Sequence, residues 1–291
     1  MAIRKERCEI NKITEKTAEK LRQLKKLILK KAKIKKGTST DNIKLGNMGS
    51  WAMLFGSCEW YIPELDVTVK GTCGEHCRGC FNPENPKCSA CYVAKSYVKY
   101  TNRNEDGTIG DILKNPCSVK KGHAFRTIAM TMFRKDLLIS LDKQLTNMKK
   151  KLEVVRINES GELTCYEDLN MWCELGKRHP ETVFYLYTKN YKVVRKALIN
   201  GIIPNNLFVN ISIWHEFGIE EYLEMKDHPQ IRAFCLVDKE WTREDYYNKG
   251  IEITSMCGAY DENGKMNHAV TCDKCKKCFS SINKCTGCFS H

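Results

Sequence analysis

Residues 182–213 begin with Thr182-Val-Phe-Tyr-Leu-Tyr-Thr188 and end with Leu207-Phe-Val-Asn-Ile-Ser-Ile213. Both runs are short and rich in β-branched and aromatic residues, which is typical of strands. The segment between them has a helical pattern up to Asn200. A strand, a helix and a second strand in this order favour a parallel α/β sheet.

The same alternation extends in both directions from this stretch. Further strands are predicted over residues 65–70, 152–157, 231–237 and 251–256, and helices over residues 123–150 and 166–178. Six such units fit a partial (β/α)6 barrel better than a complete barrel, which needs about 250 residues. We therefore predict three segments: a basic helical arm over residues 1–40, an α/β partial barrel over residues 41–256, and a cysteine-rich segment over residues 257–291.

Composition limits the classes of protein that need to be considered. The chain has 291 residues, 42% of them hydrophobic, which is enough for a packed core. It contains no apolar run of about 18 residues, and its N-terminus is charged, so we expect no membrane span, no signal peptide and a cytoplasmic location in a bacterial or phage-infected cell. The 17 cysteines occur in tight clusters. In a reducing compartment this pattern indicates metal binding rather than disulfides.

The positive charge is concentrated at the N-terminus. Residues 1–36 hold fourteen Lys or Arg and four Glu, which accounts for most of the net charge of +13. Apolar residues recur there at near-helical spacing, so one face of a helix is expected to pack on the body. The opposite face is either a solvated surface or a contact for nucleic acid or an acidic partner.

The first cysteine cluster follows the predicted strand 65–70 and reads Cys73-Gly-Glu-His-Cys77-Arg-Gly-Cys80. Three thiolates in this spacing can hold a [4Fe–4S] cluster and leave one iron open to another ligand. The spacing and position resemble the signature loop of radical S-adenosylmethionine (SAM) enzymes, in which SAM binds the open iron. The alternative is a closed zinc site, in which Cys88 or Cys91 completes four ligands.

Polar residues also follow the later predicted strands. The second strand leads into Ser160-Gly161-Glu162, and the resemblance implies that such a turn binds the SAM amino group. Lys189, after the third strand, is a candidate for a SAM carboxylate or a substrate anion. Asn210 and Ser212 alternate with apolar residues in the fourth strand, so they are expected to face a barrel lumen and bind a ribose or a carboxylate.

A second metal site is predicted near the C-terminus. Its expected ligands for an auxiliary [4Fe–4S] cluster are Cys257, Cys272, Cys275 and Cys278. The alternative is zinc held by two C-x2-C pairs, which would use Cys285 and Cys288 together with Cys272 and Cys275.

The whole pattern resembles the radical-SAM-like proteins of phages and prophages. The resemblance rests on the Cys73–Cys80 loop, Cys91-Tyr-Val-Ala-Lys-Ser-Tyr97, Arg156–Glu162, Phe184–Asn190 and the C-terminal cysteines, and it spans about residues 65–290. It implies a radical SAM partial barrel and a [4Fe–4S] cluster, but no particular substrate. Members of this group close the first cluster with a Cys-Tyr pair, which keeps Cys91 and Cys88 as alternative ligands.

We therefore expect a radical SAM enzyme that cleaves SAM reductively to a 5′-deoxyadenosyl radical. Its electron is expected from a flavodoxin or ferredoxin, and its substrate is expected to be a nucleic acid or a peptide. The alternative is an iron–sulfur or zinc protein that binds nucleic acid through the basic helix and performs no SAM chemistry.

Overall fold

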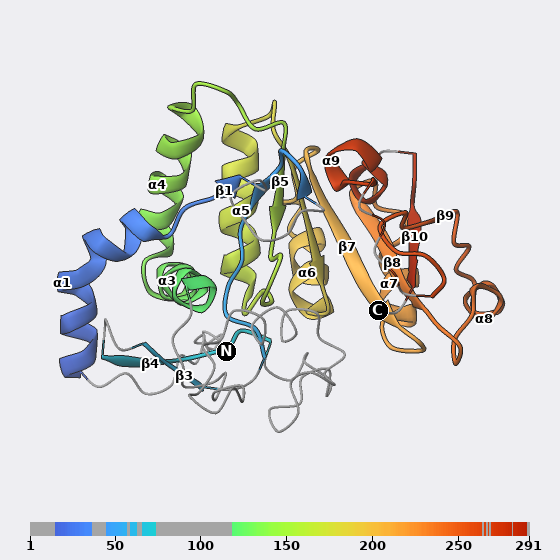
Figure 1. Cartoon of the computed structure of the whole chain (residues 1–291), viewed down its shortest axis with the longest axis horizontal. Helices are drawn as coiled ribbons and strands as arrows, with labels where there is room; N and C mark the ends of the chain where they lie inside the picture. Colours follow the sequence, from blue (N-terminus) through green and yellow to red (C-terminus); the bar gives the residue numbers. More distant parts are fainter. Residues whose placement is uncertain are drawn as a thin grey trace. The chain divides into compact units, whose positions relative to one another are not determined.

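The computed structural model describes residues 15–36, 45–56, 59–62, 66–73, 118–263, 265, 267, 269–280 and 282–289 (Figure 1). The chain forms two compact units, each assembled from separate stretches of sequence. Unit 1 comprises residues 1–33, 52–141 and 160–171, and unit 2 comprises residues 34–51, 142–159 and 172–291.

Unit 2 is built on a mostly parallel sheet. Its strands are β1 (Lys35–Lys36), β2 (Gly49–Ser50), β5 (Val154–Ile157), β6 (Val183–Thr188), β7 (Leu207–Trp214), β8 (Ile231–Val237), β9 (Ser255–Met256) and β10 (Cys285–Phe289). They lie in the order β1-β2-β5-β6-β7-β8-β10-β9. Every pairing from β2 onward is parallel, and β1 joins β2 in the antiparallel direction.

The two faces of this sheet differ in chemistry because side chains alternate along each strand. One face, called the apolar face here, carries buried aliphatic side chains such as Leu186, Val209 and Ile211. Register-matched residues on the opposite face are polar or aromatic, and we call it the polar face. Its defining residues are Arg156, Tyr185, Tyr187, Asn210, Arg232 and Thr286.

Unit 2 also contains helices that follow the strands and a C-terminal segment. The helices after the strands are α5 (Tyr166–Arg178), of which residues 172–178 belong to unit 2, and then α6 (Tyr191–Ile199), α7 (Ile219–Met225) and α8 (Arg243–Asn248). The C-terminal segment forms α9 (Cys272–Cys275), the 3-10 helix η5 (Lys277–Phe279) and then β10. Phe279 packs with Tyr185 and Phe208, so this segment lies on the polar face.

Unit 1 contains α1 (Glu15–Lys31), α3 (Ser118–Met132), most of α4 (Arg134–Thr146) and a hairpin of β3 (Glu59–Ile62) with β4 (Val67–Lys70). Leu21 and Ile28 of α1 are buried, and α1 packs against α3. Two lysines of α1 form ion pairs, Lys20 with Asp66 at 3.2 Å and Lys25 with Asp136 at 2.6 Å. The basic helix is thus packed onto unit 1, as its apolar periodicity predicted.

The structure confirms an α/β fold with a mostly parallel sheet, but it corrects the first strand. Residues 67–70 form a strand that pairs antiparallel with β3 in a separate two-stranded sheet. The parallel sheet begins at β2 instead, where Gly49 pairs with Val155. Alternating buried and exposed residues in β4 are typical of a half-exposed antiparallel strand, whereas β7 is nearly buried throughout.

Three further boundaries differ from the predictions. The helix expected over residues 123–150 is two helices, α3 and α4, separated at Phe133. Only Ser255–Met256 of the strand expected over residues 251–256 pairs with a neighbour. The C-terminal segment, expected to stand apart from the barrel, inserts β10 between β8 and β9.

Candidate metal centre

Cys73, the first residue of the predicted cluster loop, is held against residues 54–56 of unit 1. The Cys73 N–H donates to the Gly56 carbonyl at 3.1 Å, and the Gly56 N–H donates to the Cys73 sulfur, also at 3.1 Å. A Cβ atom at Gly71 would lie 2.1 Å from the Phe55 carbonyl oxygen, so only glycine permits this approach. Cys77, Cys80, Cys88 and Cys91 lie outside the described residues.

The predicted Ser160-Gly161-Glu162 turn lies directly against the start of this loop. The Glu162 N–H donates to the Thr72 hydroxyl at 2.8 Å, and the Ser160 hydroxyl donates to the Met53 carbonyl at 2.7 Å. Gly161 has φ of 81°, and a Cβ there would lie 2.5 Å from the Thr72 hydroxyl oxygen. The structure therefore brings the turn and Cys73 together within unit 1, and both properties of Gly161 require glycine.

A buried carboxylate anchors the segment that follows the turn. Asp168 is completely buried in α5, and one of its oxygens accepts from Arg134 Nε at 3.0 Å and from an Arg134 terminal nitrogen at 2.6 Å. Its other oxygen accepts from the Thr164 N–H at 2.9 Å and from the Thr164 hydroxyl at 2.6 Å. These contacts tie Thr164, which precedes α5, to the first turn of the helix and hold the N-terminus of α5 against α4.

The other residues predicted to contact SAM lie in unit 2. The Lys189 ammonium stands 4.8 Å from the centre of the Trp214 ring, a cation–π contact. Asn210 is fully buried, and its amide donates to the carbonyls of Leu186 at 3.1 Å and Cys278 at 3.0 Å. Ser212 is half-buried on the same face as Asn210. Asn210 is thus linked to the C-terminal cysteine segment.

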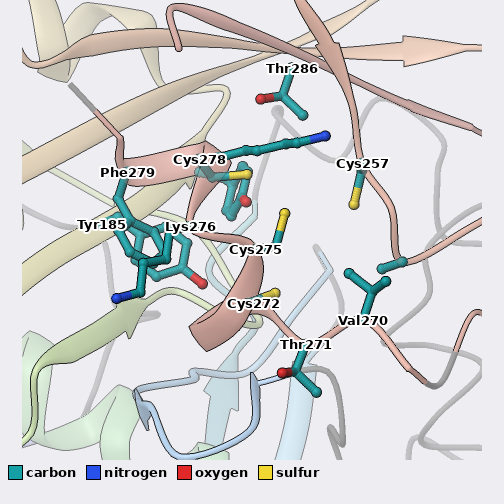
Figure 2. A pocket seen from close by; sticks show the side chains of 13 residues that line it. Tyr185, Cys257, Val270, Thr271, Cys272, Cys275, Lys276, Cys278, Phe279 and Thr286 are labelled. Atoms are coloured by element: carbon teal, nitrogen blue, oxygen red, sulfur yellow. The ribbon is translucent and has the colours of Figure 1, made fainter. Parts of the chain in front are cut away.

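Four predicted ligands of the C-terminal site line one pocket beside the polar face. Figure 2 shows the sulfur atoms of Cys257, Cys272, Cys275 and Cys278 around the same space. Cys272 and Cys275 come from α9, Cys278 from η5, and Cys257 follows β9. Within the described ranges, no group of three or more His, Cys, Asp or Glu side chains is drawn together tightly enough to hold a metal ion.

The two remaining cysteines of the segment lie on β10. The Cys285 sulfur is 3.6 Å from the sulfur of Cys235, whose neighbours on the apolar face include Tyr222 of α7. Cys285 therefore points away from the pocket, whereas Thr286, one residue later, lines it. Because neighbouring residues of a strand point to opposite faces, Cys285 lies on the other side of the sheet from Cys272 and Cys275. A zinc site that uses both C-x2-C motifs would need all of these sulfurs on one side, so it does not fit this geometry.

The lining of the pocket fits an iron–sulfur cluster. Burial raises the pKa of the Cys278 thiol to about 12. A hydrogen bond from Tyr187 lowers this pKa, but its effect is smaller than that of burial. A thiolate there needs nearby positive charge, which a bound metal group supplies. The Tyr185 hydroxyl is buried in the pocket without a hydrogen-bond partner, so a bound acceptor would satisfy it.

Sequence reasoning missed a histidine–carboxylate pair at the ends of β7 and β8. His215 Nε2 lies 3.0 Å from Asp238 Oδ2, and the other Asp238 oxygen accepts the N–H groups of Glu240 and Trp241. The His215 ring stacks on Trp241 at 5.7 Å, and its backbone is left-handed, with φ of 53°. Asp238 directly follows a predicted strand and His215 lies two residues after another, close to the rule that singled out Lys189, so the sequence did contain the signal.

Comparison with known proteins gives one family. The sequence matches the family described as gene product 88 over residues 26–291, which includes every cysteine of both predicted metal sites. No radical SAM family matches the chain. Searches of curated proteins and of solved structures return no match. Because the match covers most of the sequence, the chain belongs to the gene product 88 family, a phage-type family.

Proposed function

We propose that this protein is a radical SAM enzyme with a partial-barrel fold. The observation that carries the proposal is the packing of the Ser160-Gly161-Glu162 turn on Thr72, the residue before Cys73. A small, tightly turned backbone and a carboxylate next to the first cysteine of the predicted cluster motif would suit an amino acid group bound next to a cluster. Cys73, Cys77 and Cys80 would hold the [4Fe–4S] cluster, which would supply the electron for reductive cleavage of SAM to methionine and a 5′-deoxyadenosyl radical.

Each residue of the turn would have a different role in binding SAM. Gly161 lets the backbone approach the ligand, and the buried Glu162 carboxylate would accept a hydrogen bond from the SAM ammonium. Ser160 holds the turn through its bond to the Met53 carbonyl. Lys189 and Ser212 stay predicted contacts for the SAM carboxylate and ribose. Asn210, whose amide also donates to the Cys278 carbonyl, stays a predicted contact for the ribose or carboxylate as well.

The C-terminal pocket is proposed to hold an auxiliary [4Fe–4S] cluster through Cys257, Cys272, Cys275 and Cys278. Four thiolates complete the ligand set of such a cluster. Two observations support this choice: the shared pocket, and the position of Cys285 on the opposite face of β10. A flavodoxin or ferredoxin is the proposed source of electrons.

The test is metal analysis and EPR spectroscopy of anaerobically purified protein. We expect about eight irons per chain, from two four-iron clusters, and a signal after dithionite reduction that changes when SAM is added. About four irons with one zinc would keep the radical SAM site and replace the auxiliary cluster by zinc. A reduced cluster whose signal is unaffected by SAM would contradict the enzyme proposal.

A second candidate function is nucleic-acid binding, favoured by the exposed lysines of α1. Lys16, Lys26, Lys30 and Lys31 are exposed to solvent. We expect affinity for a labelled RNA or DNA duplex to fall steeply with salt, since each phosphate contact contributes a slope of about 0.7–0.9 in log K against log salt. Replacing Lys26 and Lys30 by Gln should weaken binding and reduce that slope.

The matched control replaces two exposed lysines of unit 2, Lys239 and Lys249, by Gln. It removes the same charge but leaves α1 intact, so affinity should stay close to that of the unchanged protein. An equal loss of affinity in both variants would show that net charge alone attracts the nucleic acid, with no interface on α1. The measurement is fluorescence anisotropy at several salt concentrations.

A further inference from the structure

The Tyr185 hydroxyl is the feature of the C-terminal pocket that the proposed ligand set leaves unused. Tyr185 is 1% exposed and lines the pocket with the four cysteines. Its ring centroid lies 4.8 Å from that of Phe279 and 5.9 Å from that of Tyr187. These contacts fix the direction of the phenol, yet its oxygen has no hydrogen-bond partner in the described structure. A buried hydroxyl normally has a hydrogen-bond partner, and a group bound in the pocket would provide one.

The groups around the pocket add positive potential. Tyr187 hydrogen-bonds to the Cys278 sulfur, and the Arg156 guanidinium lies 4.9 Å from the centre of the Tyr187 ring. Lys276 and Lys277 line the pocket, and its lining residues, all of them described, include no carboxylate. A group that gains negative charge is stabilised in such surroundings.

We infer that the Tyr185 hydroxyl donates a hydrogen bond to a sulfur of the cluster held by Cys257, Cys272, Cys275 and Cys278, and thereby raises its reduction potential. The inference rests on the auxiliary-cluster part of the proposed function. One-electron reduction adds a negative charge to the cluster, and that charge is shared by its sulfurs. A hydrogen bond to a sulfur therefore stabilises the reduced state more than the oxidised state. Tyr187 acts in the same direction through Cys278.

The test is an EPR-monitored redox titration with dithionite as the reductant. The full-length chain is compared with full-length Tyr185→Phe, both carrying Cys73→Ala, Cys77→Ala and Cys80→Ala so that only the C-terminal cluster contributes. Phe keeps the ring that packs on Phe279 and removes only the hydroxyl. We expect the iron content to be retained and reduction to become about tenfold less favourable, which lowers the midpoint by about 59 mV for a one-electron couple.

Two further variants make the result specific. Tyr187→Phe should lower the midpoint in the same direction, because it removes the hydrogen bond to Cys278. Tyr222→Phe is the matched control, since Tyr222 lies near Cys235 and Cys285 on the opposite face of the sheet, and it should leave the midpoint unchanged.

An unchanged midpoint in Tyr185→Phe, with the cluster present, would overturn the inference. Loss of iron in that variant would also overturn it, because the hydroxyl would then be needed to build the site rather than to set its potential. If metal analysis found zinc or no metal in the C-terminal pocket, no cluster would be bound there, and the inference would be wrong. The radical SAM proposal is judged separately, by the response of the unchanged protein's EPR signal to SAM.

Discussion

Cys73→Ala is expected to abolish 5′-deoxyadenosine formation from SAM and to remove about four of the expected eight irons. Cys73 is the first ligand of the proposed cluster, and it directly follows Thr72, whose hydroxyl accepts from the turn that would bind SAM. With one of three ligands missing, the cluster has no stable attachment that leaves an iron open. The measurements are chromatography of the nucleoside product after dithionite reduction and colorimetric iron analysis.

Cys173→Ala provides the control for this prediction. Cys173 is a fully buried thiol of α5, and burial raises its pKa to about 12, so it is a neutral, apolar side chain. Its replacement should leave SAM cleavage and iron content unchanged at a small cost in stability. If Cys73→Ala still produced 5′-deoxyadenosine, the radical SAM proposal would be wrong.

Asp168→Ala is expected to lower the free energy of unfolding by about 3 kcal/mol, because removing one partner of a buried ion pair leaves the other charge uncompensated. Asp168 is fully buried, and the side chain of its partner Arg134 is 22% exposed, which limits the loss to the lower end of the usual range. The Thr164 N–H and hydroxyl also lose their acceptor. The Ser160-Gly161-Glu162 turn precedes this segment, so SAM binding should weaken as well.

Urea unfolding followed by circular dichroism measures the stability change, with Glu174→Ala as the control on the same helix. Glu174 pairs with Lys177 at 3.0 Å, but both side chains are more than 40% exposed. Exposed pairs contribute at most about 0.5 kcal/mol, so this variant should unfold like the unchanged protein. Equal stability losses in the two variants would show that the Asp168 network does not support the fold.

The strands that were best predicted are those in the middle of the sheet. Residues 231–237 form β8 as predicted, and residues 207–213 form β7 with one additional residue, Trp214. Their runs of β-branched and aromatic residues are buried on both faces, and this leaves a strong local signal. The short strands near the ends of the sheet were predicted poorly. β2, which lies next to the edge strand β1, is two residues long, and its pairing with β5 depends on a neighbour more than a hundred residues away.

For the C-terminal site too, the sequence predicted one part and the structure decided another. Sequence spacing proposed Cys257, Cys272, Cys275 and Cys278 as one group, and the structure places all four at one pocket. Spacing could not separate them from Cys285 and Cys288, because the C-x2-C repeat looks alike in both pairs. The structure separates Cys285 from the four, because neighbouring residues of β10 point to opposite faces of the sheet and the Cys285 sulfur contacts that of Cys235. Cys288 stands on the same face as Thr286 and, like Cys257 and Cys272, lies near Tyr260.

The sequence by itself determined which chemistry the chain can carry: clustered thiols, a glycine turn before a carboxylate, and alternating strands and helices. These signals are local, since each depends on residues within one loop or one element. Only the tertiary structure decided that the Ser160-Gly161-Glu162 turn lies on Thr72, that Asn210 contacts Cys278, and that the Tyr185 hydroxyl is buried beside four cysteines. The reason is physical: strand pairing and burial join residues that are distant in sequence, and no local pattern records which of them will meet.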